Sequence, residues 1–152
     1  MLHLVLIAPE IPHNAGAAGR LALATGSRLH LVKPLGFSLD DKHVRRTGLD
    51  YWKDVDLQVW DDFSELRQAA YPSARFWFLS TKAGRAHWDA EFSDGDYLVF
   101  GCESRGLPEA MVREAGMHGL RIPMAEASTR SLNLSTAIAI TLYEAVRQTG
   151  TL

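Results

Sequence analysis

The sequence predicts an α/β fold with a single open, mostly parallel sheet flanked by helices, and three observations support this prediction. Short apolar runs recur along the 152 residues, and near-continuous apolar runs are typical of strands buried on both faces of a parallel sheet. Segments with helical signals alternate with these runs, as in βαβ units. No internal repeat, low-complexity tract or linker interrupts the alternation, so we expect residues 1–152 to form one domain.

The first half of the chain shows this alternation clearly. Residues 2–8 are almost entirely apolar and predict the first strand. Asn14 can cap a helix that runs to Thr25 and ends at Gly26. Residues 28–33 and 55–60 predict two further strands, separated by an irregular segment over 35–53 that has space for a short helix. Acidic residues in the first turn of residues 61–70 favour a helix there.

The second half predicts three more strands, over residues 74–79, 97–100 and 119–122. Pro108 favours the start of a short helix, because proline is well tolerated in a first helical turn. Ser131 or Asn133 can cap a final helix that extends to Gln148.

This final helix is apolar on more than one face, since a stripe of four residues is extended around the helix by three more. The stripe and its extension are Leu134, Ile138, Leu142 and Ala145, with Ala137, Ala139 and Ile140. A helix of this kind needs a second surface besides the sheet. A second subunit would supply it, which predicts a homodimer, and burial inside its own monomer is the alternative.

Composition supports a folded protein that is not held on nucleic acid by bulk charge. Hydrophobic residues make up 47% of the chain and charged residues 22%, which suits a buried core. The net charge is 16 − 18 = −2, which leaves only a local basic site for nucleic acid. The amino terminus lacks the positive segment of a signal peptide, and no apolar run reaches the ~18 residues of a membrane span. We therefore expect a cytoplasmic protein that does not bind membranes.

The histidines and the cysteine predict no metal site. Cys102 is the single cysteine, and the six histidines do not approach the spacings of metal ligands.

A glycine-rich segment lies between the first strand and the first helix. Residues 14–19, Asn-Ala-Gly-Ala-Ala-Gly, differ by one residue from the dinucleotide motif G-x-G-x-x-G. However, five residues with two prolines separate the segment from the strand, and the second strand ends in Lys33-Pro34 instead of an acidic residue. Gly16 and Arg20 share a helix face, where glycine would let a nucleic-acid backbone approach and arginine would bind a phosphate. A small-residue helix packed on the sheet, with a solvated arginine, is the structural alternative.

Two later segments also have the residue types of a binding site. In residues 100–108, Phe-Gly-Cys-Glu-Ser-Arg-Gly-Leu-Pro, two glycines bracket a loop after a strand, which is where open α/β sheets bind ligands. Residues 121–124, Arg-Ile-Pro-Met, are followed by Ser-Leu-Asn-Leu-Ser at 131–135, a helix start with free N–H groups and hydroxyls. Each segment taken alone also fits an ordinary loop or cap.

Together, in this order and spacing, the three segments resemble the motifs of the SPOUT class of S-adenosylmethionine-dependent RNA methyltransferases. The matching patterns are Asn14-x-Gly16-x-x-x-Arg20, Gly101-x-Glu103-x-x-Gly106-Leu107-Pro108, and Arg121-Ile122-Pro123-Met124 followed by Ser131-Leu132-Asn133-Leu134-Ser135. The resemblance covers nearly the whole chain. The lead-in at residues 9–14, with Asp40-Asp41-Lys42 and Gly48-Leu49-Asp50-Tyr51, makes it closest to the minimal members of the class. These methylate the ribose 2′-hydroxyl of a tRNA wobble cytidine or uridine without a separate RNA-binding domain.

The resemblance implies a fold and a site. The C-terminal part would form a deep trefoil knot, the cofactor S-adenosylmethionine would bind bent within it, and a homodimer would place the site near the subunit interface. The product would be S-adenosylhomocysteine, and no metal would take part. Six residues would contact the cofactor: Leu79, Gly101, Ile122, Met124, Ser131 and Leu132. Five would serve catalysis: Arg20, Asn14, Glu103, Ser131 and Asn133.

Chemistry limits the roles that this resemblance implies. Arginine stays protonated, so we expect Arg20 to hold the substrate phosphate and polarise the 2′-oxygen, and Glu103 to orient Arg20 or a backbone loop. The tRNA anticodon stem-loop would contact a basic set: Lys42, Arg45, Arg46, Arg105 and Arg130. Tyr51, Trp52 or Trp88 would stack on a base, or else belong to the core. The alternatives are methylation of another tRNA or rRNA site, an inactive RNA-binding module, and a dinucleotide-dependent enzyme.

Overall fold

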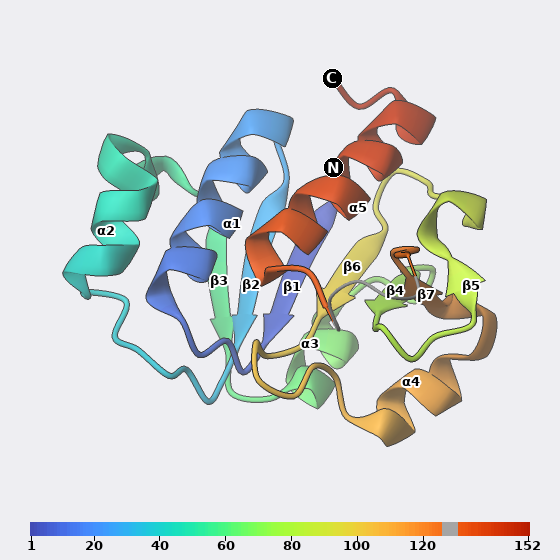
Figure 1. The fold of residues 1–152 in the computed structure, drawn as a ribbon. Helices are drawn as coiled ribbons and strands as arrows, with labels where there is room; N and C mark the ends of the chain where they lie inside the picture. The colour runs from blue at the N-terminus through green and yellow to red at the C-terminus, as the bar shows by residue number, and fades with distance from the viewer. Residues whose placement is uncertain (126–130) are drawn as a thin grey trace.

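The computed structural model describes residues 1–125 and 131–152, and over these it contains one seven-stranded sheet. All strands are parallel, in the order β3-β2-β1-β6-β4-β7-β5 (Figure 1). The strands are β1 (His3–Ile7), β2 (Arg28–Val32), β3 (Leu57–Trp60), β4 (Phe76–Leu79), β5 (Arg85–Ala86), β6 (Tyr97–Phe100) and β7 (Gly119–Arg121). The predicted α/β fold with an open parallel sheet is confirmed.

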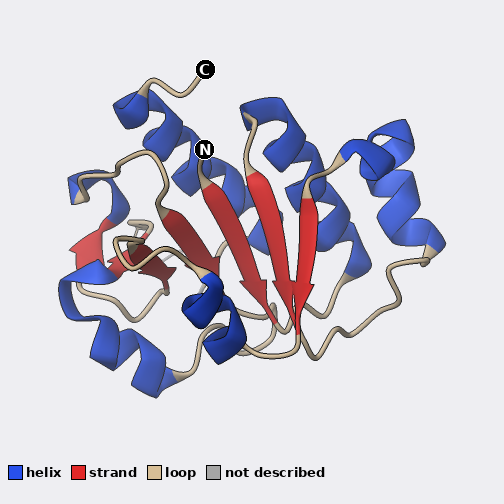
Figure 2. Ribbon diagram, turned by 180° about the vertical axis from the view of Figure 1, so that it is seen from behind, coloured by secondary structure: helices blue, strands red, loops and turns tan. Residues whose placement is uncertain are grey.

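Helices cover both faces of this sheet. Helices α1 (Pro12–Thr25) and α5 (Leu134–Thr149) lie on one face with α2 (Lys42–Gly48) beside α1, and α3 (Phe63–Ala69) and α4 (Glu109–Ala115) lie on the other face (Figures 1 and 2). The described part of the chain also contains three short 3-10 helices: η1 (Leu49–Asp54), η2 (His87–Asp89) and η3 (Gly116–His118).

The alternation of side chains along each strand produces two cores. On β1, Leu4 and Leu6 pack with Ala18 of α1 and Ile138 of α5, whereas the intervening Val5 packs in the core under α3. Successive strand residues point to opposite faces, so a strand buried on both faces must be apolar throughout. This explains why the strands appear in the sequence as continuous apolar runs.

Most element boundaries agree with the sequence prediction to within two residues. Helix α1 ends at Thr25 with Gly26 in the left-handed conformation (φ 64°), and Asn133, not Ser131, caps α5. Two assignments were wrong. Asn14 lies inside α1, whose cap position is Ile11, and Pro108 is the cap residue of α4, one position before its first turn. The segment expected to be irregular contains α2 and η1.

The short strand β5 and the 3-10 helix η2 were not predicted. Strand β5 has two residues and pairs only with β7 at the edge of the sheet, so it produces no apolar run in the sequence.

Candidate functional site

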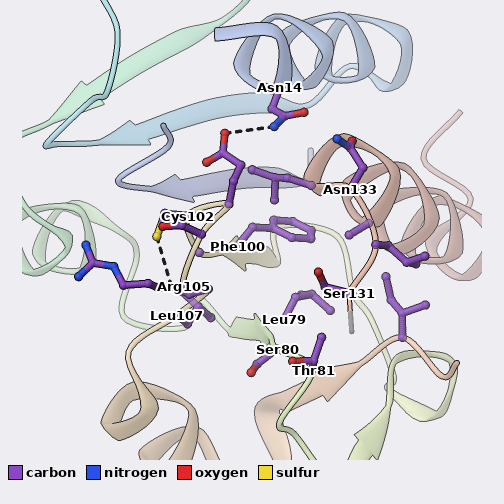
Figure 3. Close-up of a pocket in the computed structure, with 18 of the residues that line it drawn as sticks. Asn14, Leu79, Ser80, Thr81, Phe100, Cys102, Arg105, Leu107, Ser131 and Asn133 are labelled. Carbon is purple, nitrogen blue, oxygen red and sulfur yellow. Dashed lines mark hydrogen bonds between the residues drawn. The ribbon is translucent and has the colours of Figure 1, made fainter. Parts of the chain in front are cut away.

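A cavity of about 490 Å³ lies at the carboxyl ends of β4 and β6 (Figure 3). Ligands in open parallel sheets bind beyond the carboxyl ends of strands, where the following loops diverge. Four segments that are distant in sequence form the walls. The first is residues 79–82, from the end of β4, and the second is residues 100–107, from the end of β6. The third is residues 122, 124, 131–134 and 137, from the end of β7 to the first turn of α5, and the fourth is residues 11 and 14 at the start of α1.

The loop after β6 is folded tightly against itself. A Cβ atom at Gly101 would lie 2.1 Å from the carbonyl carbon of Gly106, so only glycine fits at this position. Gly106 has φ 68°, and its N–H donates to the Cys102 carbonyl at 2.8 Å. Both glycines of the predicted motif are therefore needed to close the loop that forms one wall of the cavity.

Glu103 joins this loop to the start of α1. Its carboxylate accepts hydrogen bonds from the backbone N–H groups of Glu10 (2.8 Å) and Ile11 (2.7 Å), and from Nδ2 of Asn14 at 3.1 Å, which Figure 3 draws. The cap residue Ile11 has no side-chain acceptor, so a carboxylate about ninety residues away satisfies the helix start. A negative charge there also interacts favourably with the helix dipole. Of the two roles expected for Glu103, the geometry matches the orientation of a backbone segment.

A second contact between the same two loops runs in the opposite direction. The Glu10 carboxylate accepts hydrogen bonds from the Ser104 hydroxyl at 2.6 Å and from the Ser104 N–H at 2.9 Å. These bonds, led by that of the hydroxyl, lower the pKa of Glu10 below its ordinary value. Glu10 and Glu103 thus exchange bonds across the two loops and fix the end of β6 against α1.

Asn14 and Asn133 lie at the starts of two different helices. Asn14 is buried in the first turn of α1 and lines the cavity. The Asn133 Oδ1 accepts from the N–H groups of Ser135 (2.9 Å) and Thr136 (3.4 Å), which makes it the cap of α5. Figure 3 shows both residues at the same end of the cavity.

All six residues predicted to contact a cofactor line this one cavity: Leu79, Gly101, Ile122, Met124, Ser131 and Leu132. Sequence reasoning assigned no cofactor contact to Ser80, Thr81, Lys82 and Ala137, which also line the cavity, whereas Phe100 and Leu107 belong to the segment 100–108 that it selected. Their signal was available in part, because Ser80 to Lys82 directly follow β4 and so occupy the carboxyl edge of the sheet.

Arg20 is not among the residues that line the cavity of its own chain. It follows Asn14 by six residues, which places it about 9 Å further along the axis of α1. It is exposed, and its Cζ atom lies 5.7 Å from the centroid of the Tyr51 ring. Gly16 is buried, so the expectation that a nucleic-acid backbone approaches it was wrong for the isolated chain.

The predicted RNA contacts occupy two regions. Lys42 and Arg46 are exposed on α2, and Arg105 is exposed at the cavity. Arg130 lies outside the described residues, as does the side chain of Arg45. Tyr51 and Trp88 are 48% and 57% exposed, which separates them from the core, whereas Trp52 packs against the core.

Two properties of the described residues bear on other classes of site. No helix within residues 1–125 and 131–152 has the length and apolar character needed to cross a bilayer. The same part of the chain holds no group of three or more histidine, cysteine or acidic side chains placed to bind a metal.

The chain is similar to curated proteins over almost its whole length. It is 48% identical to a tRNA (cytidine(34)-2'-O)-methyltransferase of Saccharophagus degradans, with 99% of this chain and 97% of that protein aligned. It is also 48% identical to the protein of the same name from Methylovorus glucosotrophus, over 97% of this chain and 96% of that protein.

Solved structures show the same fold. A structure described as giving structural insights into the 2-OH methylation of C/U34 on tRNA superposes with a TM-score of 0.92 at 47% identity, covering 97% of this chain and 95% of that one. The SpoU methyltransferase AviRb of Streptomyces viridochromogenes, in complex with AdoMet, superposes with a TM-score of 0.85 at 26% identity, covering 97% of this chain and 57% of that one.

The resemblance expected from the three motifs is thus confirmed by comparison. The SpoU rRNA methylase family matches residues 1–143. With that match and relatives 48% identical along its length, this chain belongs to the SpoU rRNA methylase family.

Proposed function

We propose that this protein transfers a methyl group from S-adenosylmethionine to the ribose 2′-hydroxyl of the wobble nucleotide, cytidine or uridine, in the tRNA anticodon loop. The observation that carries the proposal is that residues from each of the three sequence motifs line one cavity, in a chain that is 48% identical to relatives named for methylation at cytidine 34. The protein would act in the cytoplasm, with one domain serving both the cofactor and the RNA.

The cavity suits the proposed cofactor in size and chemistry. Its volume of about 490 Å³ falls within the ~300–1,000 Å³ that is typical of small-molecule sites. Apolar side chains such as Leu79, Ile122 and Leu132 would pack on the adenosine, and the closely packed glycine loop would bring backbone groups to it. When bound, the cofactor supplies the electrophilic methyl group on its sulfonium.

The chain's own residues would align and activate the ribose. The reaction is an in-line displacement, so the 2′-oxygen must be held opposite the methyl group. Asn14, Ser131 and Asn133 line the cavity and would hold it there. The positive charge of an arginine side chain suits Arg20 for binding the adjacent phosphate and for stabilising the charge that develops on the 2′-oxygen. Glu103 would act on the cofactor loop by holding it to α1 through its three hydrogen bonds.

The distance between Arg20 and its own cavity supports a homodimer as part of the proposal. We propose that Arg20 serves the cavity of a second copy, because it does not line its own. The side of α5 that faces away from the core carries Ile140 and Tyr143, which are 37% and 44% exposed and provide an apolar surface for that copy.

We further propose that the C-terminal part of the chain is threaded as a deep trefoil knot. Two features of the fold support this. Strand β7 lies between β4 and β5, both of which precede it in sequence, and the chain then returns past the cavity so that α5 packs beside α1. Such threading is an exception to the usual unknotted topology of proteins.

The tRNA would be bound by local basic patches, because the net charge of −2 provides no bulk attraction. Lys42, Arg45 and Arg46 belong to α2 and would form one patch. Arg105 lines the cavity and would form a second contact, together with Arg130, which lies outside the described residues.

Transfer of a labelled methyl group to tRNA by the purified protein, followed by mapping of the 2′-O-methyl group, tests the proposal. Incorporation at nucleotide 34, and loss of that modification in cells lacking the protein, are the expected results. Binding of tRNA and S-adenosylhomocysteine without transfer would instead indicate an inactive RNA-binding module. Methylation at another tRNA or rRNA position would identify a different substrate, and calorimetric binding of NAD in place of S-adenosylhomocysteine would overturn the cofactor.

A further inference from the structure

We propose that Tyr51 is a positioning residue that orders the Arg20 guanidinium for methyl transfer while leaving its positive charge intact. The inference rests on the proposed function, because it assigns the role to Tyr51 through Arg20. It begins from one contact: the Arg20 Cζ atom lies 5.7 Å from the centroid of the Tyr51 ring, within the range of a cation–π interaction.

The contact is built into the packing of η1 on α1. A Cβ atom at Gly19 would lie 2.6 Å from Cζ3 of the Trp52 ring and 3.3 Å from Cγ2 of Val55, so the tryptophan rests directly on the glycine. Trp52 and Val55 also pack against the main core, which fixes η1 in place. The contact between Gly19 and Trp52 therefore fixes η1 against α1. The neighbouring residues, Arg20 and Tyr51, are brought together as a result, with the ring beside the guanidinium.

The packing role of Gly19 also differs from that of the third glycine in a dinucleotide-binding motif. In such a motif the third glycine allows the helix to approach the neighbouring strand. Here Gly19 accommodates the indole of Trp52 from the segment after α2. The close contact at residue 19 thus sets the position of the next residue, Arg20.

An aromatic partner has a specific advantage for an arginine that must bind a phosphate. A carboxylate would neutralise the guanidinium and would have to be displaced before the phosphate could bind. The face of an aromatic ring restricts the guanidinium but leaves its N–H edge available for hydrogen bonds. Among the described side chains, Tyr51 is the partner of the Arg20 guanidinium, and both residues remain exposed. Restricting the side chain before the substrate arrives reduces the entropic cost of reaching the transition state.

The same exposed ring is able to stack on an RNA base, and this second role makes different predictions. A ring that acts through Arg20 affects kcat and the mobility of the guanidinium. A ring that stacks on a base affects the KM for tRNA and leaves the guanidinium unchanged in the free protein.

The experiment compares wild type with Tyr51→Leu, Tyr51→Gln and Tyr51→Phe in the full-length protein. The matched control is Tyr71→Leu, because Tyr71 is 83% exposed and lies far from α1, in the connection between α3 and β4. Calorimetry with S-adenosylhomocysteine verifies that each variant is folded and retains its cavity. Two quantities are then measured: the kinetics of methyl transfer to tRNA, and the ¹⁵N heteronuclear NOE of the Arg20 Nε–H group.

We expect Tyr51→Leu and Tyr51→Gln to lower kcat by about tenfold, with little change in KM for tRNA, and to decrease the NOE of the Arg20 group. Tyr51→Phe and Tyr71→Leu should behave as wild type. An unchanged kcat in Tyr51→Leu, a loss confined to KM, or an equal loss in Tyr51→Phe would overturn the inference. If wild type itself transfers no methyl group, the proposed function fails, whereas an NOE that is the same in wild type and Tyr51→Leu shows that the contact does not order Arg20.

Discussion

The rings of His3 and His30 are hydrogen-bonded to each other, with His3 Nδ1 and His30 Nε2 2.9 Å apart. The Trp60 indole N–H donates to His30 Nδ1 at 3.0 Å, so the proton of a neutral His30 must lie on Nε2 and be donated to His3. Burial lowers the pKa of both histidines, to about 4 for His3 and about 3 for His30. His3 is the first residue of β1 and His30 the middle residue of β2, and neither lines the candidate site at the carboxyl ends of β4 and β6.

This pair predicts that the protein loses stability below neutral pH. The pKa of each histidine is lower in the folded chain than its ordinary value of 6.5, so the unfolded chain takes up protons first. The stabilisation is therefore complete above pH 6.5 and declines as the pH falls toward 4. After a discount for the partial exposure of His3, we expect the free energy of unfolding to drop by about 2 kcal/mol between pH 7 and pH 5. Urea denaturation at several pH values measures it.

The control for this prediction removes the titrating pair. The charged groups that act on it are Arg28 and the terminal amine, which lower the pKa of His3, and Asp56 and Asp94, which raise it. The double variant His3→Phe/His30→Leu should retain less than half of the pH dependence, with a remainder from His87, whose pKa burial also lowers. A variant as pH-sensitive as wild type would show that the pair is not responsible.

Gly101 predicts a strict steric requirement in the cofactor loop. In Gly101→Ala the new Cβ atom would meet the Gly106 carbonyl carbon at 2.1 Å and the Leu107 nitrogen at 2.2 Å, so the loop must open. We expect a loss of about 1–3 kcal/mol in the free energy of unfolding and loss of S-adenosylhomocysteine binding by calorimetry. Gly84→Ala is the matched control, because a methyl group added at Gly84 would have no atom within 4 Å. Wild-type binding and stability in Gly101→Ala would contradict the packing.

The basic patch that we propose on α2 predicts a separation of RNA binding from cofactor binding. Charge reversal at Arg45 and Arg46 should weaken tRNA binding by about tenfold or more and reduce its dependence on salt concentration. Binding of S-adenosylhomocysteine should be unchanged, since α2 does not line the cavity. Arg113→Glu, exposed on α4 across the sheet, controls for bulk charge. A similar loss in that control, or an equal loss of both ligands in the α2 variants, would rule out a specific patch.

Most of the fold could be predicted because the sequence signals for its strands and helix ends lie within a few neighbouring residues. A strand that is buried on both faces is predominantly apolar, so β4 and β6, and β1 apart from His3, could be located from composition alone. Helix α1 ends where Gly26 adopts a left-handed backbone conformation. Helix α5 begins where the Asn133 side chain accepts a hydrogen bond from the N–H group of Ser135, two residues later. Strand β5 lacks this information, because two residues at a sheet edge are stabilised by their neighbour β7.

The residues of the site could be predicted where they belong to short sequence motifs, but the contacts between distant segments could not. Spacing brought the cofactor residues together, but it did not reveal that Glu103 satisfies the start of α1, and Asn14 was taken for the cap as a result. This bond joins residues 92 apart, and no local pattern encodes it. In the same way, the Arg20 motif predicts a role and a helix, but not which cavity the side chain reaches. The Arg20 side chain contacts Tyr51 and does not line the cavity of its own chain.

The position of Arg20 predicts that each working site combines two chains. Arg20→Ala should bind S-adenosylhomocysteine normally, because Arg20 does not line the cavity, yet lose methyl transfer by about 100-fold or more. Ile122→Trp should fill the cavity and lose the cofactor. Co-expressed chains with different affinity tags, one carrying each substitution, give a heterodimer with one intact cavity and one intact arginine on opposite chains. If Arg20 acts across the interface, this heterodimer should recover about half of wild-type transfer while both variant homodimers stay inactive.

The competing outcome is equally definite. If Arg20 acts on the cavity of its own chain, the heterodimer has no complete site, because the chain with the intact cavity lacks the arginine and the other chain lacks the cavity. Its rate would then match that of the inactive homodimers. A wild-type rate in homodimeric Arg20→Ala would show instead that neither cavity uses the arginine. Measuring labelled methyl transfer by the three purified species at equal protein concentration distinguishes these cases, since each arrangement of Arg20 gives its own pattern of active and inactive dimers.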